Sequence, residues 1–206
     1  MDGWGAPPDW LDDCRRMVAR YRVHAAHAEK VARLCDRLFT AAAPIHGLDE
    51  AERVPLVAAG FLHDLGHFQG ADQHHRHSHY AILHDEGLAA WHTPLRVQVA
   101  ALALNHRKRK RLGLSEFERP QRARLRAGAA LLRLADVLDR DHRQLAEVHD
   151  VRLDADHRRV TVLLGGVDLA FLQPHLARKG QWAAQWWQLE WEFVCGEASV
   201  RVVPEP

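Results

Sequence analysis

The stretch Leu62-His63-Asp64-Leu65-Gly66-His67 places an adjacent His-Asp pair at the expected end of an apolar helix. Polar side chains that ionise are costly to bury unless something pairs with them. Three further segments offer an imidazole or a carboxylate from a similar apolar setting, at His27, His106 and Asp136. A divalent metal shared by these groups explains the pattern, and the sequence therefore predicts a metal-dependent hydrolase.

Helical periodicity dominates the first three quarters of the chain. Val31, Leu34 and Leu38 recur at helical spacing within a predicted helix over 24–43, and His27 lies on the same stripe. Helices that each carry one ligand can converge on a metal inside a bundle. Residues 69–75 are predicted to form a polar loop. Further helices are predicted over 9–22, 49–65, 77–84, 93–106 and 121–140.

The pattern changes beyond residue 145. Two β-branched runs, 148–153 and 159–164, flank a polar turn and predict a hairpin. We expect 167–171 to extend this sheet, a Trp-rich helix over 174–193, and a last strand over 198–203.

The tryptophans at 182, 186, 187 and 191 have helical spacing. This spacing indicates packing against the sheet or a homodimer contact rather than a platform for stacking nucleobases. We therefore expect a mainly α protein, with a helical domain over 1–145 and a small α+β appendage over 146–206 packed on it.

Composition narrows the class of protein. The 206 residues are 47% hydrophobic and 27% charged, with a net charge of +1, which is ordinary for a soluble globular protein. The near-zero net charge disfavours a general binder of nucleic acid or membrane surfaces. No stretch approaches the roughly 18 apolar residues of a membrane span, and the N-terminus does not resemble a signal peptide. Three cysteines without a Cys-x-x-Cys pair fit reduced thiols, so we expect a cytoplasmic protein.

Histidine is unusually frequent, at 16 of 206 residues. Many of these histidines can be surface residues that reflect codon bias, since arginine also greatly outnumbers lysine. A lone histidine on an apolar face is more often a hydrogen-bonded core residue than a metal ligand. The prediction of a metal site therefore depends on position, and in particular on the adjacent pair at 63 and 64.

The order His27, His63-Asp64, Asp136 resembles the HD-domain metal-dependent phosphohydrolases. Three segments are more narrowly similar to the C-terminal HD-type region of the exopolyphosphatase/guanosine pentaphosphate phosphatase (Ppx/GppA) family. They are His74-His75-x-His77-Ser78-x-Tyr80, Asn105-His106-Arg107-Lys108 and the stretch from Leu132 to Arg140.

The resemblance covers most of the chain and implies an HD-domain helical bundle. Members of that family carry an actin-like phosphatase domain ahead of this region, with a phosphate-binding loop, and no such Gly-rich loop occurs in these 206 residues. The named activity of the family is therefore not transferred directly. The intact His-Asp pair suggests instead that this module is an enzyme by itself.

The resemblance also implies a ligand set. His27, His63, Asp64 and Asp136 match the residues that hold a single metal. His77 and His106 fall where relatives with two metals place further histidines, and Asp64 would then bridge. Mixed imidazole and carboxylate ligands suit Mn, Fe, Zn, Ni or Co better than a calcium cage, and Mg is a further candidate. The alternatives to His77 are His74, His75 and His79.

Phosphoester hydrolysis then requires metal-activated water and cations for the phosphoryl oxygens. We expect Asp64, His67 and Lys108 to be catalytic, with His67 as an acid for the leaving group. Arg107, Lys108 and Arg140 are expected to bind phosphate. A plain alternative is that the basic run 107–111 is a solvated helix end. Another is that Arg140 forms a structural salt bridge with Asp139 or Asp136.

The sequence therefore predicts a divalent-metal phosphohydrolase, either a phosphatase or a phosphodiesterase. Its expected partner is a small phosphorylated ligand: a nucleotide, a guanosine polyphosphate or inorganic polyphosphate. The alternative is a regulatory module that binds phosphate-rich ligands without turnover. A third interpretation, an RNA-binding protein led by residues 106–111, is disfavoured by the net charge.

Overall fold

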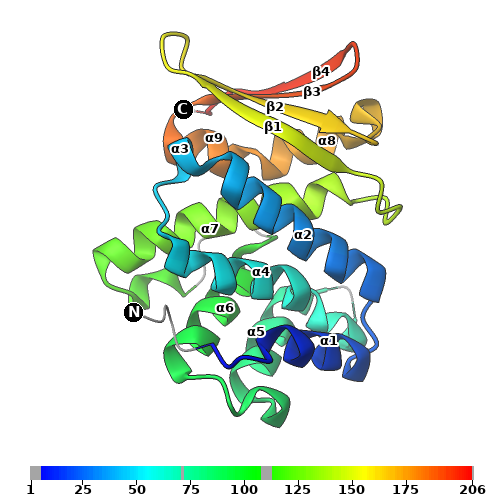
Figure 1. Ribbon diagram of the computed structural model, residues 1–206, viewed down its shortest axis with the longest axis vertical. Coiled ribbons are helices and arrows are strands. Elements are labelled where there is room, and N and C mark those ends of the chain that lie inside the picture. The colour runs from blue at the N-terminus through cyan, green and yellow to red at the C-terminus, as the bar shows by residue number, and fades with distance from the viewer. Residues whose placement is uncertain (1–5, 71, 108–112, 206) are drawn as a thin grey trace.

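The computed structural model describes residues 6–70, 72–107 and 113–205. The expected fold class is confirmed: a helical bundle carries a small α+β unit at one end (Figure 1). Lys108 lies outside the described residues, and so does its predicted role. Among the described residues, no helix is long and apolar enough to span a bilayer.

The bundle forms because its helices bury apolar stripes against one another. On α2 the stripe from Val31 to Phe39 is buried as its periodicity predicts. Helix α7 is buried on almost all sides from Ala127 to Leu138, and it forms the centre of the bundle. The main helices are α1 (Trp10–Arg20), α2 (Ala25–Ala41), α4 (Arg53–Leu62), α5 (His74–His84), α6 (Thr93–Asn105) and α7 (Arg119–Leu138).

Short helical turns connect these elements. They are α3 (Ala43–His46), η1 (Glu50–Glu52), η2 (Leu65–Gln69), η3 (Glu86–Leu88) and η4 (Leu114–Glu116). The turn η2 matters most for function, because it carries the chain directly from the His-Asp pair towards α5.

The C-terminal unit is a four-stranded sheet in the order β1-β2-β3-β4. The hairpin of β1 (Glu147–Asp154) and β2 (Arg159–Gly165) is antiparallel, as predicted. Strand β3 (Glu190–Cys195) runs parallel to β2 and pairs antiparallel with β4 (Ala198–Val202). A parallel pair needs a crossover connection.

The crossover is made by α8 (Leu169–Lys179) and α9 (Gln181–Trp187). These two helices lie between the sheet and α7 (Figure 1). Val160 and Val162 of β2, with Trp191 and Phe193 of β3, are completely buried. The sheet is therefore fixed onto the bundle through a layer of helices.

Two expectations for this unit are wrong. Residues 167–171 do not extend the sheet, because Asp168 caps α8: its Oδ1 accepts from the backbone N–H groups of Ala170 and Phe171. The helix expected over 174–193 is also interrupted. Helix α9 ends at Trp187, and Gln188 takes a left-handed conformation that turns the chain into β3.

Helix boundaries near the His-Asp pair also differ from expectation. Helix α4 ends at Leu62, so His63 and Asp64 follow the helix rather than belong to it. Helix α5 begins at His74, three residues earlier than predicted, so the end of the expected polar loop is helical. This shift brings a different histidine into the first turn of α5.

Candidate metal centre

Four of the predicted residues converge where α2, α4 and α7 meet. His27 lies in the first turn of α2, His63 and Asp64 directly follow α4, and Asp136 lies near the end of α7. His27 Nε2 is 4.0 Å from Asp64 Oδ2 and 3.9 Å from Asp136 Oδ1. His63 Nε2 is 3.5 Å and 4.0 Å from the same two oxygens. The four side chains surround a common point, and His27, His63 and Asp64 form a group that could hold a metal ion.

The other oxygen of Asp64 faces a second set of imidazoles. Asp64 Oδ1 is 3.2 Å from His74 Nε2, 3.5 Å from His67 Nε2 and 3.7 Å from His106 Nε2. Asp64, His67 and His74 form a second group whose ligand atoms lie close enough to share an ion. Asp64 therefore lies between two clusters of nitrogen donors.

His77, the histidine chosen from sequence for the second cluster, is in neither group. His74 lies there instead, one turn earlier on α5. Gly66 permits this approach: a Cβ at that position would lie 2.1 Å from the carbonyl oxygen of His74. The Gly66 N–H also donates to Ser78 Oγ at 2.8 Å. The sequence left His74 open as an alternative, but the resemblance to HD proteins with two metals favoured His77.

Hydrogen bonds at Nδ1 fix the tautomers of two imidazoles. His63 Nδ1 is 2.8 Å from the carbonyl oxygen of Gly60, and His106 Nδ1 is 2.7 Å from that of Ala103. A carbonyl oxygen only accepts, so each Nδ1 carries the hydrogen and each Nε2 presents a lone pair to the cluster. Within the described part of the chain, His63 Nε2 is buried without a hydrogen-bond partner. A metal would satisfy this atom.

His27 is oriented by a carboxylate that sequence reasoning did not include in the site. His27 Nδ1 donates to Asp139 Oδ2 at 2.8 Å, and Asp139 is fully buried. The other oxygen of Asp139 accepts from the backbone N–H of Gln144. His142 stacks on His27 with ring centroids 4.0 Å apart. A buried carboxylate behind a histidine is typical of metal-binding imidazoles.

Arg107 joins the second cluster through His74. Its Nη1 donates to His74 Nδ1 at 3.0 Å. His74 Nε2 then carries the hydrogen and lies 3.1 Å from His106 Nε2. His74 thus differs from the other imidazoles, since in this arrangement it presents an N–H to the cluster. The predicted phosphate-binding residue Arg107 is brought to the site.

Lys179 is a site residue that the sequence gave no reason to select. It lies at the end of α8, is only 5% exposed, and donates from Nζ to Asp136 Oδ2. Arg133, which is also buried, lies one turn before Asp136 on α7 and stacks over Trp182. Burial lowers the pKa of Arg133 to about 10. Two cations from the interface between bundle and appendage therefore border the carboxylates.

The electrostatics favour ionised carboxylates and neutral imidazoles. Burial opposes ionisation of Asp64, but His63 and the hydrogen-bonding His67 and His74 hold its pKa well below the usual range. Burial likewise opposes ionisation of Asp136, but Lys179 and His63 lower its pKa. Burial lowers the pKa of His63. These are the protonation states that bind a divalent cation.

His67 lies at the mouth of the cluster and behaves differently from the buried imidazoles. It is exposed, and its contact with Asp64 raises its pKa. A histidine that keeps its proton near neutral pH is suited to donate it to a leaving group.

The donor set fits a divalent metal. It combines neutral imidazole nitrogens with two carboxylates, which suits Mn, Fe, Co, Ni or Zn better than an all-oxygen calcium cage. The buried, unpartnered Nε2 of His63 and the orientation of His27 and His106 are what such a site requires.

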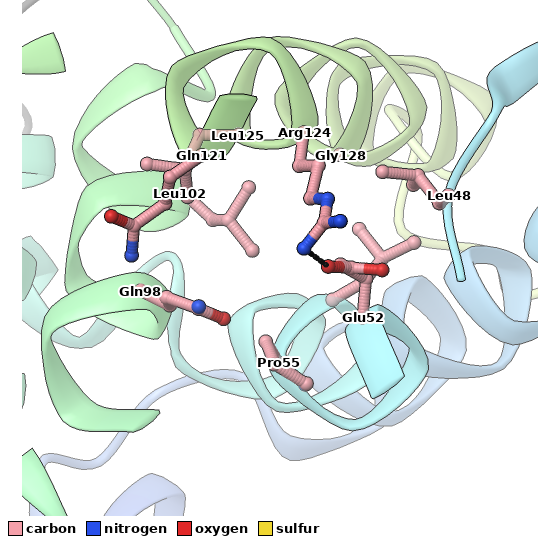
Figure 2. Close-up of a pocket in the computed structure, with 10 residues that line it drawn as sticks. Leu48, Glu52, Pro55, Gln98, Leu102, Gln121, Arg124, Leu125 and Gly128 are labelled. Atoms are coloured by element: carbon pink, nitrogen blue, oxygen red, sulfur yellow. Dashed lines mark ion pairs between the residues drawn. The ribbon is translucent and has the colours of Figure 1, made fainter. Parts of the chain in front are cut away.

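Arg140 and the pocket between α4, α6 and α7 lie apart from these contacts. Arg140 is exposed after the end of α7, and within the described residues neither Asp136 nor Asp139 forms an ion pair with it. The pocket is lined by apolar and polar side chains, which include an ion pair of Arg124 with Glu52 (Figure 2). It contains none of the cluster residues.

The sequence was compared with models of known protein families. A family model described as Ppx/GppA phosphatase, domain III, matches residues 13–179. The match crosses the boundary expected at 145 and spans the cluster from His27 to Lys179. It confirms the resemblance to the Ppx/GppA region and is consistent with the HD-domain superfamily. No curated protein matches the chain.

Proposed function

The chain belongs to the Ppx/GppA phosphatase family through its domain III, and on this premise we propose that it is a divalent-metal-dependent phosphohydrolase that acts on a small phosphorylated substrate. The observation that carries the proposal is the convergence of the imidazoles of His27 and His63 with the carboxylates of Asp64 and Asp136 on one point. His27, His63, Asp64 and Asp136 would hold one metal. His106 would present its Nε2 lone pair to a second position on the Oδ1 side of Asp64, with the Nε2–H of His74 beside it.

A divalent metal bound there would lower the pKa of water and neutralise charge on the phosphoryl oxygens. The chain supplies the remaining functions. Asp64 presents its two oxygens to the two clusters, and so fixes where reacting groups lie. Arg107, held beside His74, is positioned to contact a phosphoryl oxygen. Arg140 remains a proposed second phosphate contact from the end of α7.

His67 is the proposed acid for the leaving group. It lies 3.5 Å from Asp64 at the exposed mouth of the cluster, where a substrate can reach it. Asp64 raises its pKa, which favours the protonated form that an acid for the leaving group requires. The imidazoles of His27, His63 and His106 are buried and lack this exposure.

The test combines metal content with turnover. Freshly purified protein is expected to contain divalent metal by elemental analysis and to release phosphate or nucleotide from a panel of phosphorylated metabolites with added Mn²⁺. Asp64→Ala is expected to lose both metal and turnover. Asp156→Ala, an exposed acid in the β1–β2 turn, serves as the matched control and is expected to keep both. Tight binding of phosphorylated ligands without turnover under any metal would favour the regulatory module instead.

A further inference from the structure

An open groove adjoins the metal cluster and carries an unusual combination of side chains. It is lined by Arg20, Tyr21, Arg22, His67 and Phe68. His67 belongs to both places, because its Nε2 lies 3.5 Å from Asp64 Oδ1. The groove encloses about 1130 Å³ of empty space, part of it open to solvent. A substrate whose phosphate reaches Asp64 therefore has room to extend much further.

Phe68 is the exposed apolar side chain of this surface. It is 55% exposed, although it directly follows a residue of the cluster. Tyr21 packs edge-to-face against it, with ring centroids 5.0 Å apart. Exposed apolar groups beside a polar site mark surfaces that bind something. Because both rings are planar, they suit a planar partner.

The aromatic wall is held in place by Asp85. Tyr21 Oη donates to Asp85 Oδ2 at 2.7 Å, and Arg20 Nη1 donates to Asp85 Oδ1 at 3.0 Å. The carboxylate therefore fixes Tyr21 and neutralises Arg20. Among the described residues no carboxylate pairs with Arg22, which is exposed. The groove thus presents aromatic surface and one uncompensated arginine.

From this arrangement we infer that the substrate is a nucleoside phosphate, whose base stacks against Phe68 and Tyr21 while its phosphate reaches the Asp64 cluster. Among the described residues that line the groove, Arg22 is the one uncompensated arginine, and a linear inorganic polyphosphate would gain nothing from the two rings. Any nucleobase gains stacking energy on aromatic rings, with little preference among the bases. Arg22 can add a cation–π or phosphate contact. The inference rests on the proposed function for the position of the phosphate.

Binding measurements test the subsite separately from turnover. Adenosine 5′-monophosphate and ribose 5-phosphate carry the same phosphate, and only the former carries a base. By calorimetry on the Mn²⁺-loaded protein, the nucleotide is expected to bind about tenfold more tightly. Phe68→Ala is expected to abolish that preference and leave the affinity for ribose 5-phosphate unchanged. Phe68→Trp is expected to keep the preference.

Phe171→Ala is the matched control, since Phe171 is an exposed phenylalanine on α8 outside the groove. It is expected to retain the tenfold preference. Equal affinities of the wild-type protein for the two ligands would overturn the inference, and so would a Phe68→Ala variant that keeps the preference. If the protein binds both ligands with equal affinity and releases phosphate from both equally well, the proposed nucleobase subsite is wrong while the proposed function stands. If the nucleotide is preferred and Phe68-dependent but never hydrolysed, the subsite stands and the proposed function fails.

Discussion

Lys179 Nζ donates to Oδ2 of Asp136, the oxygen opposite the one that faces His27 and His63. One carboxylate therefore links α8 of the C-terminal unit to the cluster in the bundle. The contact means that the C-terminal elements complete the site rather than merely cover the bundle. It also gives Asp136 a cationic partner on the side away from the proposed metal.

Replacing Lys179 should show that the metal site depends on the C-terminal unit. Lys179→Met leaves Asp136 buried without its partner, and breaking a buried pair costs about 3–5 kcal/mol of the free energy of unfolding. Added Mn²⁺ is expected to stabilise this variant more than the wild type, because the metal would neutralise the same carboxylate. Urea unfolding with and without Mn²⁺ measures both effects. Lys30→Met on α2 is the control. The prediction would be contradicted if Mn²⁺ raised the free energy of unfolding of the wild type and of Lys179→Met by the same amount.

The carboxylate behind His27 should tune metal affinity. Asp139→Asn keeps the shape of the side chain but removes the charge that orients His27. Metal affinity is expected to fall about 10- to 100-fold, as measured by calorimetry with Mn²⁺. Asp141→Asn, an exposed neighbour, should bind metal like the wild type. Unchanged affinity in Asp139→Asn would show that this carboxylate serves folding alone.

Two histidines one turn apart on α5 should behave differently. His74 contacts Asp64 and His106, whereas His77 contacts neither cluster. His74→Gln is expected to reduce phosphate release by about 10- to 100-fold, as for other supporting groups of metal sites. His77→Gln is expected to have activity close to that of the wild type. The reverse order of activities would assign the second position to His77.

A histidine outside the site should make stability depend on pH. His46 is buried, its Nε2 donates to the Phe39 carbonyl oxygen, and its Nδ1 accepts from the Leu48 N–H. Burial lowers its pKa from 6.5, so the unfolded chain takes up a proton at a higher pH than the folded protein does. The stability contributed by neutral His46 is therefore present above about pH 6.5 and decreases as the pH falls below that value.

His46→Gln removes the titrating group at this position. The difference in unfolding free energy between wild type and variant is expected to shrink between pH 7 and pH 5, which urea unfolding at several pH values can measure. A constant difference across this range would show that protonation of His46 is not linked to folding.

The helical part of the fold could be predicted because it depends on local periodicity. The stripe of α2 and the hairpin of β1 and β2 follow from which residues must be buried. The predicted secondary structure was wrong where a local residue starts or ends a helix inside a segment whose composition indicates something else. Asp168 starts a helix inside an apparent strand, and Gln188 ends one inside a Trp-rich run. The pattern of hydrophobic residues indicates neither of these helix ends.

The sequence alone determined that His27, His63, Asp64 and Asp136 would be directed inward, because each lies on or beside an apolar stripe that must face the core. Only the tertiary structure decided their partners. Lys179 joins the cluster from a segment that shares no pattern with it, whereas His74 and Asp139 come from segments that the sequence had marked without assigning these two residues a contact. The physical reason is that a contact such as that of Lys179 with Asp136 spans 43 residues and is fixed by how α8 packs on α7. Periodicity predicts which face of a helix is buried, but it does not predict which other side chain contacts that face.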